Sequence, residues 1–444
     1  MGNFRGRRQG VLLAATLAFG LAAVSACSGG GTAVQSGKVA NTEGAAPKGV
    51  TLTLWHNTAD SQALLGLYKA YEKKSGNTIK LVDIPADSFP STVQTKWATG
   101  ARPDILEWHG NRTDALSLNA SGTMLDLSKL AFVAKEGDLA KVSGSVGGKT
   151  YAATIGALSI SGIFYNKQVF TKAGLQPPQT YDDLAADCKV LKAKTPGVAP
   201  LFEAGGSQWP PQILSAFNYL AESNDNQAYD TSVLTGKAKL SDADGPFVAA
   251  LTAYDKLRTA GCFNSDRTTA KWEDQMKAVL DGKAAMVAQN SDSIGLLNSD
   301  ANGDTAKVDA AVGFVGVSAT KAVATYAPSP LGTYYVPSTG DSEKERAAVD
   351  FIEFATGTGY ADYIKEAKII PTLSGTTTPA LQGLLQDVKK AYDQGATLSF
   401  NSEIPGFGNF GPESSKLLAD QESPQQVADK MQAFYQQAAA AAKQ

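Results

Sequence analysis

Two tryptophans stand at the ends of predicted strands, and polar side chains follow each of them. Asn57 comes two residues after Trp55, and Asn111 and Arg112 come shortly after Trp108. An aromatic ring offers a flat apolar face, whereas amide and guanidinium groups form directed hydrogen bonds. Ligands of open α/β sheets bind outside the carboxyl ends of the strands, where these residues are expected. The pattern suits a ligand with apolar faces and a rim of hydroxyl groups.

Residues for metal or nucleophilic chemistry are poorly represented. The only two histidines, His56 and His109, have no cysteine cluster to support a transition-metal site. There is no Gly-x-Ser-x-Gly motif. Residues 318–321 spell Ser-x-x-Lys, but the Ser-Asp-Asn motif that accompanies it in penicillin-binding enzymes is absent. We therefore expect no metal, no cofactor and no catalytic residue.

The first 26 residues are predicted to be a signal peptide. Arginines in positions 5–8 precede an apolar run over 11–24, which is too short for the roughly 20 residues of a spanning helix. Residues 21–27 resemble a bacterial lipobox, in which Cys27 becomes the acylated first residue of the mature protein. The alternative is an ordinary signal peptide with a chance cysteine. The export route, Sec or twin-Arg, is left open.

The segment that follows Cys27 is expected to be a flexible tether over 27–49. Residues 28–49 contain six glycines and no aromatic side chain, so they offer little apolar surface to bury.

The remaining part, about 395 residues, is long enough for two lobes rather than one core. The whole chain, with 43% hydrophobic residues and a net charge of −3, has the composition of a folded protein without the basic excess of a nucleic-acid binder. We expect a monomer. Cys188 and Cys262 are an even pair in an oxidising compartment and are predicted to form a disulfide. The alternative is two separately buried thiols.

The hydrophobic pattern alternates strands and helices, as in an α/β layer protein. Glycines at 76 and 100 end the first two predicted helices. The predicted elements are strand 50–55, helix 61–74, strand 78–84, helix 88–99, strand 103–108, an extended region over 148–165, mostly helices from 180 to 311, strands over 312–337 and a last helix from 423.

Several short motifs, in this order and spacing, are similar to the extracellular solute-binding proteins of ABC importers, in the family that carries sugars and oligosaccharides. Each motif alone has little specificity, but together they extend over most of the chain. The motifs are Leu54-Trp55, Tyr71 to Gly76, Gly100 to Ile105, Gly148 to Ala153, Phe164 to Lys167, Phe170 to Leu175, Pro178 to Leu184 and Gly282 to Met286.

The resemblance implies an α/β, two-lobe, periplasmic-binding-protein-like fold of type II, with a ligand cleft between lobes joined by hinge segments. It assigns residues 50–157 plus 312–340 to the first lobe and 158–311 plus 341–444 to the second. The chain is expected to cross between the lobes near 157–160, 311–312 and 340.

The resemblance also implies where a sugar would be bound. Asn290 and Asp292 stand where many relatives have Gly and Trp, which favours hydrogen bonding over stacking and leaves the number of sugar units open. The alternative is a purely structural role for Trp55, Trp108 and the Ser207–Trp209 turn. The expected ligand contacts are Trp55, Asn57, Asp60, Glu107, Trp108, Asn111, Arg112, Ser207, Trp209, Asn290, Asp292, Tyr334 and Phe407.

The function expected from this resemblance is capture of a sugar or oligosaccharide at the extracellular face of the cell membrane, for delivery to the permease subunits of an ABC importer. Three alternatives remain: a lipoprotein for a non-sugar solute, a surface sensor, and a carbohydrate hydrolase. Composition does not decide whether the chain has a carboxylate pair for glycoside hydrolysis, because its 43 acidic residues offer many possible pairs.

Overall fold

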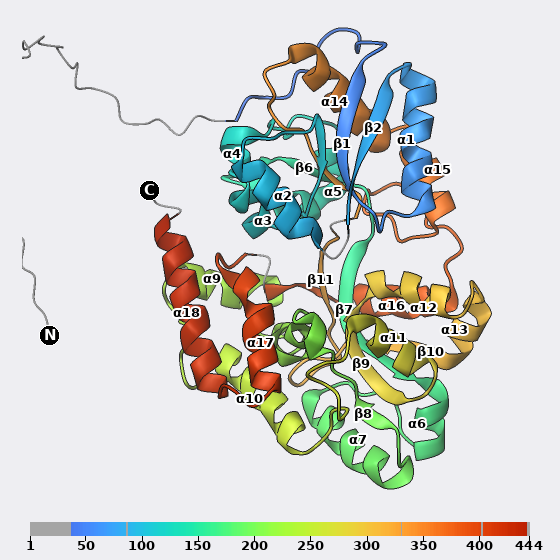
Figure 1. Cartoon of the computed structure of the whole chain (residues 1–444), viewed down its shortest axis with the longest axis vertical. Helices are drawn as coiled ribbons and strands as arrows, with labels where there is room; N and C mark the ends of the chain where they lie inside the picture. Colours follow the sequence, from blue (N-terminus) through green and yellow to red (C-terminus); the bar gives the residue numbers. More distant parts are fainter. Residues whose placement is uncertain (1–36, 86–87, 330, 401–402, 442–444) are drawn as a thin grey trace, which may run out of the picture. The chain divides into compact units, whose positions relative to one another are not determined.

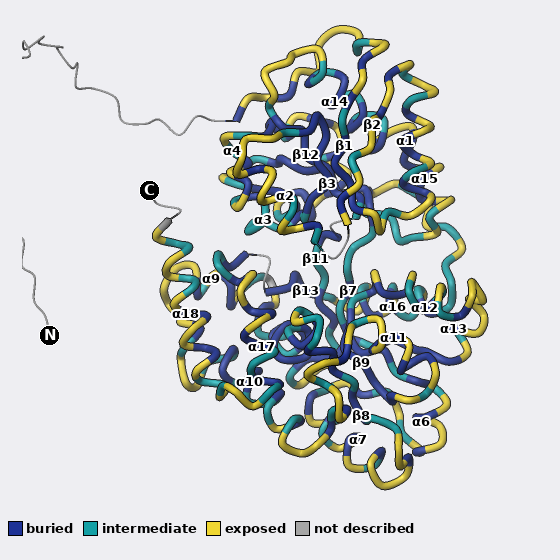
Figure 2. The backbone as a smooth tube through the Cα atoms, viewed as in Figure 1, coloured by how far each residue is buried: buried dark blue, intermediate teal, exposed yellow. Residues whose placement is uncertain are grey.

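The computed structural model describes residues 37–85, 88–329, 331–400 and 403–441. The predicted signal peptide and Cys27 lie outside these residues. Two separate β-sheets organise the described chain, and each has its own hydrophobic clusters (Figure 1). Figure 2 shows that buried positions concentrate on the strands, whereas exposed positions mark the outer faces of the helices. In the part that is described, no helix is long and apolar enough to cross a membrane.

The first sheet has the strand order β2-β1-β3-β12-β6. Strand β1 is parallel to both β2 and β3, and β12 is antiparallel to its two neighbours. Leu52 and Leu54 pack into one cluster and Trp55 into another, so helices cover both faces of this sheet. The bounds are β1 (Thr51–Asn57), β2 (Thr78–Ile84), β3 (Ile105–Glu107), β6 (Ala152–Thr154) and β12 (Thr333–Tyr335), with a separate hairpin of β4 (Ser145–Val146) and β5 (Lys149–Thr150).

The helices around the first sheet begin and end as their caps predict. Ser61 Oγ accepts a hydrogen bond from the backbone N–H of Leu64 (3.2 Å), and Gly76 takes the left-handed conformation that ends the first helix. The bounds are α1 (Gln62–Ser75), α2 (Phe89–Ala98), α3 (Arg112–Ser117), α4 (Ala120–Thr123), α5 (Phe132–Glu136), η2 (Gly137–Lys141), α14 (Ser342–Ala355) and α15 (Tyr360–Ala367).

The second sheet is built around the long strand β7, in the order β13-β11-β7-β9-β8. Strands β10 and β11 pair with successive parts of β7 on the side opposite β9. The bounds are β7 (Leu158–Asn166), β8 (Ala199–Leu201), β9 (Ala284–Asn290), β10 (Val312–Val315), β11 (Thr325–Pro328) and β13 (Thr397–Leu398).

The helices around the second sheet include the one that carries the predicted disulfide. Thr180 and Asp183 form a capping box at the start of α7, and Cys188 within it is bonded to Cys262, with a Cα–Cα distance of 5.6 Å. The bounds are α6 (Lys167–Ala173), α7 (Tyr181–Lys194), η3 (Gly205–Ser207), a π-helical turn η4 (Ile213–Phe217), α8 (Asn218–Leu220), η5 (Asp225–Gln227), α9 (Ala228–Leu234), α10 (Pro246–Thr259), α11 (Trp272–Leu280), η6 (Ser291–Ser293), α12 (Ile294–Asp300), α13 (Thr305–Ala311), α16 (Gly383–Asp393), η8 (Phe407–Asn409), α17 (Phe410–Leu418) and α18 (Pro424–Ala441).

The chain passes between the two sheets three times, and two of these passages differ from the prediction. The first, between β6 and β7, is where it was expected. The second lies between β11 and β12, because β10 and β11 belong to the second sheet. The third lies between α15 and α16, because α14 and α15 pack into the cluster of the first sheet. The assignment of all of 312–340 to the first lobe and all of 341–444 to the second is therefore wrong.

The described end of the predicted tether is docked on the first sheet's side of the molecule. The backbone N–H of Ala40 donates to the carbonyl of Asp126 (2.9 Å), and the N–H of Asp126 donates to that of Lys38 (2.8 Å). Lys38 also forms an ion pair with Glu345 (2.5 Å), and Ala40 is buried. The expectation of a free tether is wrong for residues 37–49, because backbone pairing, which needs no apolar side chain, holds this segment.

Candidate functional site

Glu107 links the carboxyl end of the first sheet to the second passage between the sheets. Its side chain is fully buried. One carboxylate oxygen accepts a hydrogen bond from the backbone N–H of Asn57 (2.9 Å), and the other accepts one from the N–H of Gly332 (2.7 Å). The predicted contacts Asn57 and Glu107 therefore bind each other, and we assign them a structural role.

Asp60 and His56 form a buried network beside Glu107. Asp60 Oδ2 accepts from the hydroxyl of Tyr68 (3.0 Å) and lies 3.1 Å from His56 Nδ1, while His56 Nε2 lies 2.8 Å from Asp83. The hydrogen bond to Asp60 raises the pKa of His56 against the opposing effect of burial. Burial and the nearby Asp60 charge raise the pKa of Glu107.

Four aromatic residues predicted to contact a ligand are core residues. Trp108 is fully buried, packs against Phe89 with ring centroids 6.0 Å apart, and donates its indole N–H to the carbonyl of Asp114 (3.3 Å). A ring with no exposed face cannot stack on a ligand, so the prediction is wrong for each of the four. They are Trp55, Trp108, Tyr334 and Phe407.

Asn111 and Arg112, which follow Trp108, have different roles. The side chain of Asn111 caps helix α3 by accepting from the backbone N–H of Asp114 (2.8 Å). Arg112 Nη1 lies 3.4 Å from Glu403 Oε2, so it connects the loop after β3 to the segment after β13. Burial raises the pKa of Glu403, and the charge of Arg112 opposes this shift. This ion pair directly links the half of the molecule that is built on the first sheet to the half that is built on the second.

The turn at 205–209 is explained by packing within the second half. Ser207 Oγ accepts from the backbone N–H of Trp272 (3.1 Å), and the Trp209 ring lies 6.1 Å from that of Trp272. A Cβ at Gly206 would lie 2.3 Å from the carbonyl oxygen of Thr269. The glycine is therefore needed for close approach of another backbone segment, not of a ligand.

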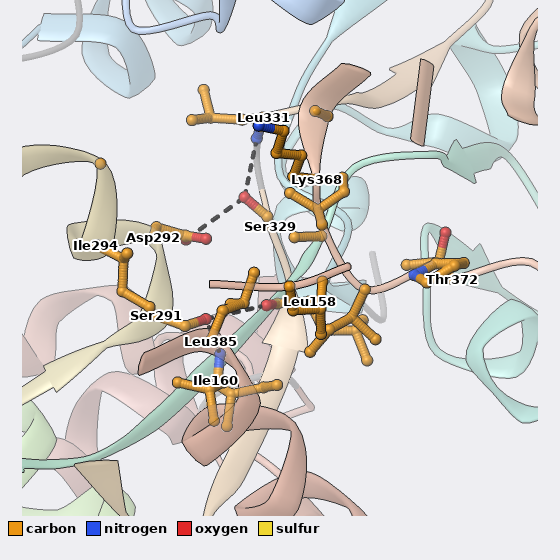
Figure 3. Close-up of a pocket in the computed structure, with 18 of the residues that line it drawn as sticks. Leu158, Ile160, Ser291, Asp292, Ile294, Ser329, Leu331, Lys368, Thr372 and Leu385 are labelled. Atoms are coloured by element: carbon orange, nitrogen blue, oxygen red, sulfur yellow. Dashed lines mark hydrogen bonds between the residues drawn. The ribbon is translucent and has the colours of Figure 1, made fainter. Parts of the chain in front are cut away.

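A cavity of about 820 Å³ lies where both halves and the passages between the sheets meet (Figure 3). This volume is within the range of small-molecule sites, about 300 to 1,000 Å³. Of the residues predicted to contact a ligand, Asp292 lines it. Its polar and aromatic lining includes Ser61, Glu136, Asp138, Ser291, Asp292, Asn298, Thr305, Tyr326, Ser329, Tyr363, Lys368, Thr372, Gln382 and Tyr392.

Asp292 is held in place from the start of strand β7 and from the second passage. Its Oδ2 accepts hydrogen bonds from the hydroxyls of Ser159 (2.7 Å) and Ser329 (3.4 Å). The next residue back, Ser291, accepts from the N–H of Ile160 (3.0 Å), as Figure 3 shows. Asp292 is accessible to solvent yet surrounded by the cavity walls, and this desolvation raises its pKa.

The other lining residues were not predicted from the sequence, and Glu136 is the buried acid among them. It ends the short helix α5, and Oε1 accepts from the backbone N–H of Thr154 (2.7 Å), just before the first passage. Burial raises the pKa of Glu136 to about 8. No motif surrounds it, and only the tertiary fold places it in the lining of the same cavity as Asp292. The third passage was missed as well, although the apolar run Ile369-Ile370-Pro371 that lines the cavity interrupts a helical stretch.

The sequence and the fold both have known counterparts. The profile of the family described as "Bacterial extracellular solute-binding protein" matches residues 55–362. Over 336 residues the chain is 22% identical to the melibiose/raffinose/stachyose-binding protein MelE of Bacillus subtilis (strain 168), which covers 72% of this chain and 74% of that protein. A solved structure of a chitin oligosaccharide binding protein superposes with a TM-score of 0.74 at 21% identity, over 88% of this chain and 99% of that one.

Another relative is a probable sugar-binding periplasmic protein of Mesorhizobium japonicum (strain LMG 29417 / CECT 9101 / MAFF 303099). It is 29% identical over 188 residues, which are 40% of this chain and 43% of that protein. The alignments with this protein and with two proteins of Pyrococcus horikoshii cover 43 to 53% of each relative's length. The chain therefore spans about half the length of these curated relatives.

Proposed function

Because this chain belongs to the bacterial extracellular solute-binding protein family, we propose that it captures a sugar or oligosaccharide outside the cell and delivers it to the permease of an ABC importer. The observation that carries this proposal is the 820 Å³ cavity, to which both halves contribute. Two partly exposed tyrosines in its lining, Tyr326 and Tyr392, offer apolar faces, and the serines, amides and carboxyl groups offer partners for hydroxyls. The sugars in the names of MelE and the chitin oligosaccharide binder support the ligand class.

The three passages give this site a mechanism. A ligand that contacts both walls stabilises the arrangement in which the walls lie close together, provided that it binds this arrangement more tightly than an open one. Asp292, which is held by strand β7 and the second passage, is the predicted residue that we propose as a ligand contact. Arg112, Ser207, Trp209 and Asn290 do not line this cavity and stay predictions.

A thermal-shift screen tests the function. The protein is melted with mono- and oligosaccharides, amino acids, short peptides and metal ions. A ligand at one hundred times its dissociation constant should stabilise the protein by about 2.7 kcal/mol. Stabilisation by one group of sugars supports the proposal. Silence of all sugars with a response to peptides or metal ions overturns it.

Two glycines provide matched variants for this screen. Gly295 in α12 lines the cavity and Gly66 in α1 does not, and a Cβ at either position meets nothing within 4 Å. Gly295→Phe should therefore obstruct part of the cavity and weaken the sugar response without loss of stability, whereas Gly66→Phe should retain the response. Equal responses of the two variants would place the sugar elsewhere.

The attachment to the membrane and the absence of turnover belong to the same proposal. We propose that Cys27 carries a lipid that holds the protein on the extracellular face of the membrane. Cys27→Ser should release the protein into the medium, and mass spectrometry of the mature N-terminus should detect the acyl chain only in the wild type. A bound oligosaccharide should stay intact after long incubation, whereas cleavage products would indicate a hydrolase.

A further inference from the structure

The charged groups that line the cavity are unequal in number. Three are acids, Glu136, Asp138 and Asp292, and one is a base, Lys368. Asp138 lies at the surface and pairs with Lys141 (2.6 Å). In the part of the chain that is described, neither Glu136 nor Asp292 lies within ion-pair distance of a basic side chain. These two carboxyl groups are therefore left to interact with whatever enters the cavity.

Glu136 has a polar atom without a partner. The residue is 6% exposed, and no described residue makes a hydrogen bond to its Oε2. A buried oxygen without a partner is destabilising, and a ligand group that reaches it restores the missing hydrogen bond. Because the pKa of Glu136 is raised to about 8, the carboxyl group is mostly protonated at neutral pH and can donate a hydrogen bond to a hydroxyl oxygen.

Asp292 approaches the cavity from the other half, on η6. The hydroxyls of Ser159 and Ser329 both engage Oδ2, and no described side chain makes a hydrogen bond to Oδ1. The two serines fix the carboxylate in place, as Figure 3 shows for Ser329. An oriented carboxylate with a free oxygen accepts from a hydroxyl or an ammonium group of a ligand, but it repels a second carboxylate brought beside it.

We propose, resting on the proposed function, that Glu136 and Asp292 bind the sugar from the two sides of the cavity and select uncharged or amino sugars against sugar acids. A hydroxyl donates to Asp292 and accepts from Glu136, and an amino group donates to either. The carboxylate of a uronic acid is repelled by Asp292, which has no cation within ion-pair distance, whereas Glu136 is mostly protonated and adds no negative charge; Lys368 is the single base in the lining. Specificity of this kind arises from repulsion of the wrong ligand.

The test uses an array of neutral, amino and uronate oligosaccharides, followed by calorimetric titration of the strongest binder and of its uronate analogue. The variants are Asp292→Asn and Glu136→Ala, with Glu136→Gln as the conservative change. Glu366→Gln is the matched control, because this exposed acid in α15 is outside the lining. Melting curves without sugar verify that each variant folds.

The expected result is that the wild type binds neutral or amino glycans and rejects uronates. Glu136→Ala and Asp292→Asn should weaken binding of the preferred glycan by about tenfold, as for loss of a charge-assisted or buried hydrogen bond. Glu136→Gln should retain most of the affinity, Asp292→Asn should admit the uronate analogue, and Glu366→Gln should match the wild type.

Failure of the selectivity is distinguishable from failure of the function. Binding of no glycan at all would overturn the proposed function and this inference with it. Binding of uronates as strong as that of neutral glycans, or an uronate preference that Lys368→Met abolishes, would overturn the inference alone. Unchanged affinity and unchanged selectivity in all variants would also overturn it, because the two acids would then have no contact with the sugar.

Discussion

The side chain of Trp108 illustrates how one residue type serves two purposes. A tryptophan at the end of a strand is a typical ligand platform, yet here the ring is enclosed by Phe89 and the elements around β3. Its indole N–H is satisfied by a backbone carbonyl within the same loop. The ring therefore stabilises the loop that carries Arg112 and has no surface left for a ligand.

Trp108→Ala should lower the free energy of unfolding by about 3–5 kcal/mol, because it leaves a large cavity in a buried cluster. Urea unfolding of the ligand-free protein measures this change. Trp209, which is partly exposed beside Trp272, provides the comparison, and Trp209→Ala should cost clearly less. Loss of sugar affinity in Trp108→Ala without loss of stability would contradict the core assignment.

The site could be predicted from the sequence only in part. Asp292, which lines the cavity, was predicted because it follows a motif that the family shares, and motifs are local. Glu136 was missed because its place depends on the hydrogen bond from Thr154 and on a cavity whose other walls lie in distant segments. Residue type near a strand end also does not tell which face of the sheet a ring will occupy, and this is why four aromatic residues were misplaced.

At the level of elements, the sequence predicted the individual strands and helices better than their partners. The first strand and helix were expected at 50–55 and 61–74 and are found at Thr51–Asn57 and Gln62–Ser75. Hydrophobic periodicity and caps determine such elements locally. An amphipathic helix such as α14, however, carries no local signal of the sheet that it covers. Its attachment to the first sheet therefore appears only in the packing.

The disulfide connects α7 to the segment after α10, and its removal should destabilise the second half. Cys188→Ser with Cys262→Ser should lower the free energy of unfolding by about 2–4 kcal/mol, because the bond closes a long loop, with a sequence separation of 74. Reductant should reproduce the loss in the wild type and have no effect on the double variant. A wild type that is indifferent to reductant would contradict this prediction.

The docked segment at 37–49 should contribute measurable stability to the first half. A protein that begins at Gly49 loses the two backbone hydrogen bonds with Asp126 and the burial of Ala40. We expect it to be about 1–2 kcal/mol less stable than one that begins at Gly37. Thermal unfolding of the two proteins measures the difference, and identical curves would show that the segment adds nothing.

At the level of the whole molecule, several buried acids make stability depend on pH. Burial raises the pKa values of Glu136, Glu203 and Asp230 to about 8 and that of Asp187 to about 6. Each folded-state value lies above the unfolded one, so the folded protein keeps protons that the unfolded chain releases. Their contribution to stability is complete below about pH 4 and is lost as pH rises toward 8.

The free energy of unfolding should therefore fall between pH 5 and pH 8, by up to about 1.4 kcal/mol per pH unit for each group. Urea unfolding at several pH values measures the slope. Glu203→Gln keeps a neutral buried side chain at one of these positions and should make the slope shallower. A free energy that is flat or rises over this range would contradict the assignment.

The position of β12 determines when the molecule can complete its first sheet. This strand comes late in the chain, after the whole of β7 to β11, yet it lies between β3 and β6. Strands β3 and β6 both precede the first passage, and each has an unpaired edge until β12 pairs with it. Closing so long a loop costs entropy before the strand pairing compensates for it, which slows folding. The two halves are thus expected to fold together in one late step, and a fragment ending at residue 157 should remain unfolded and prone to aggregate at its unpaired edges.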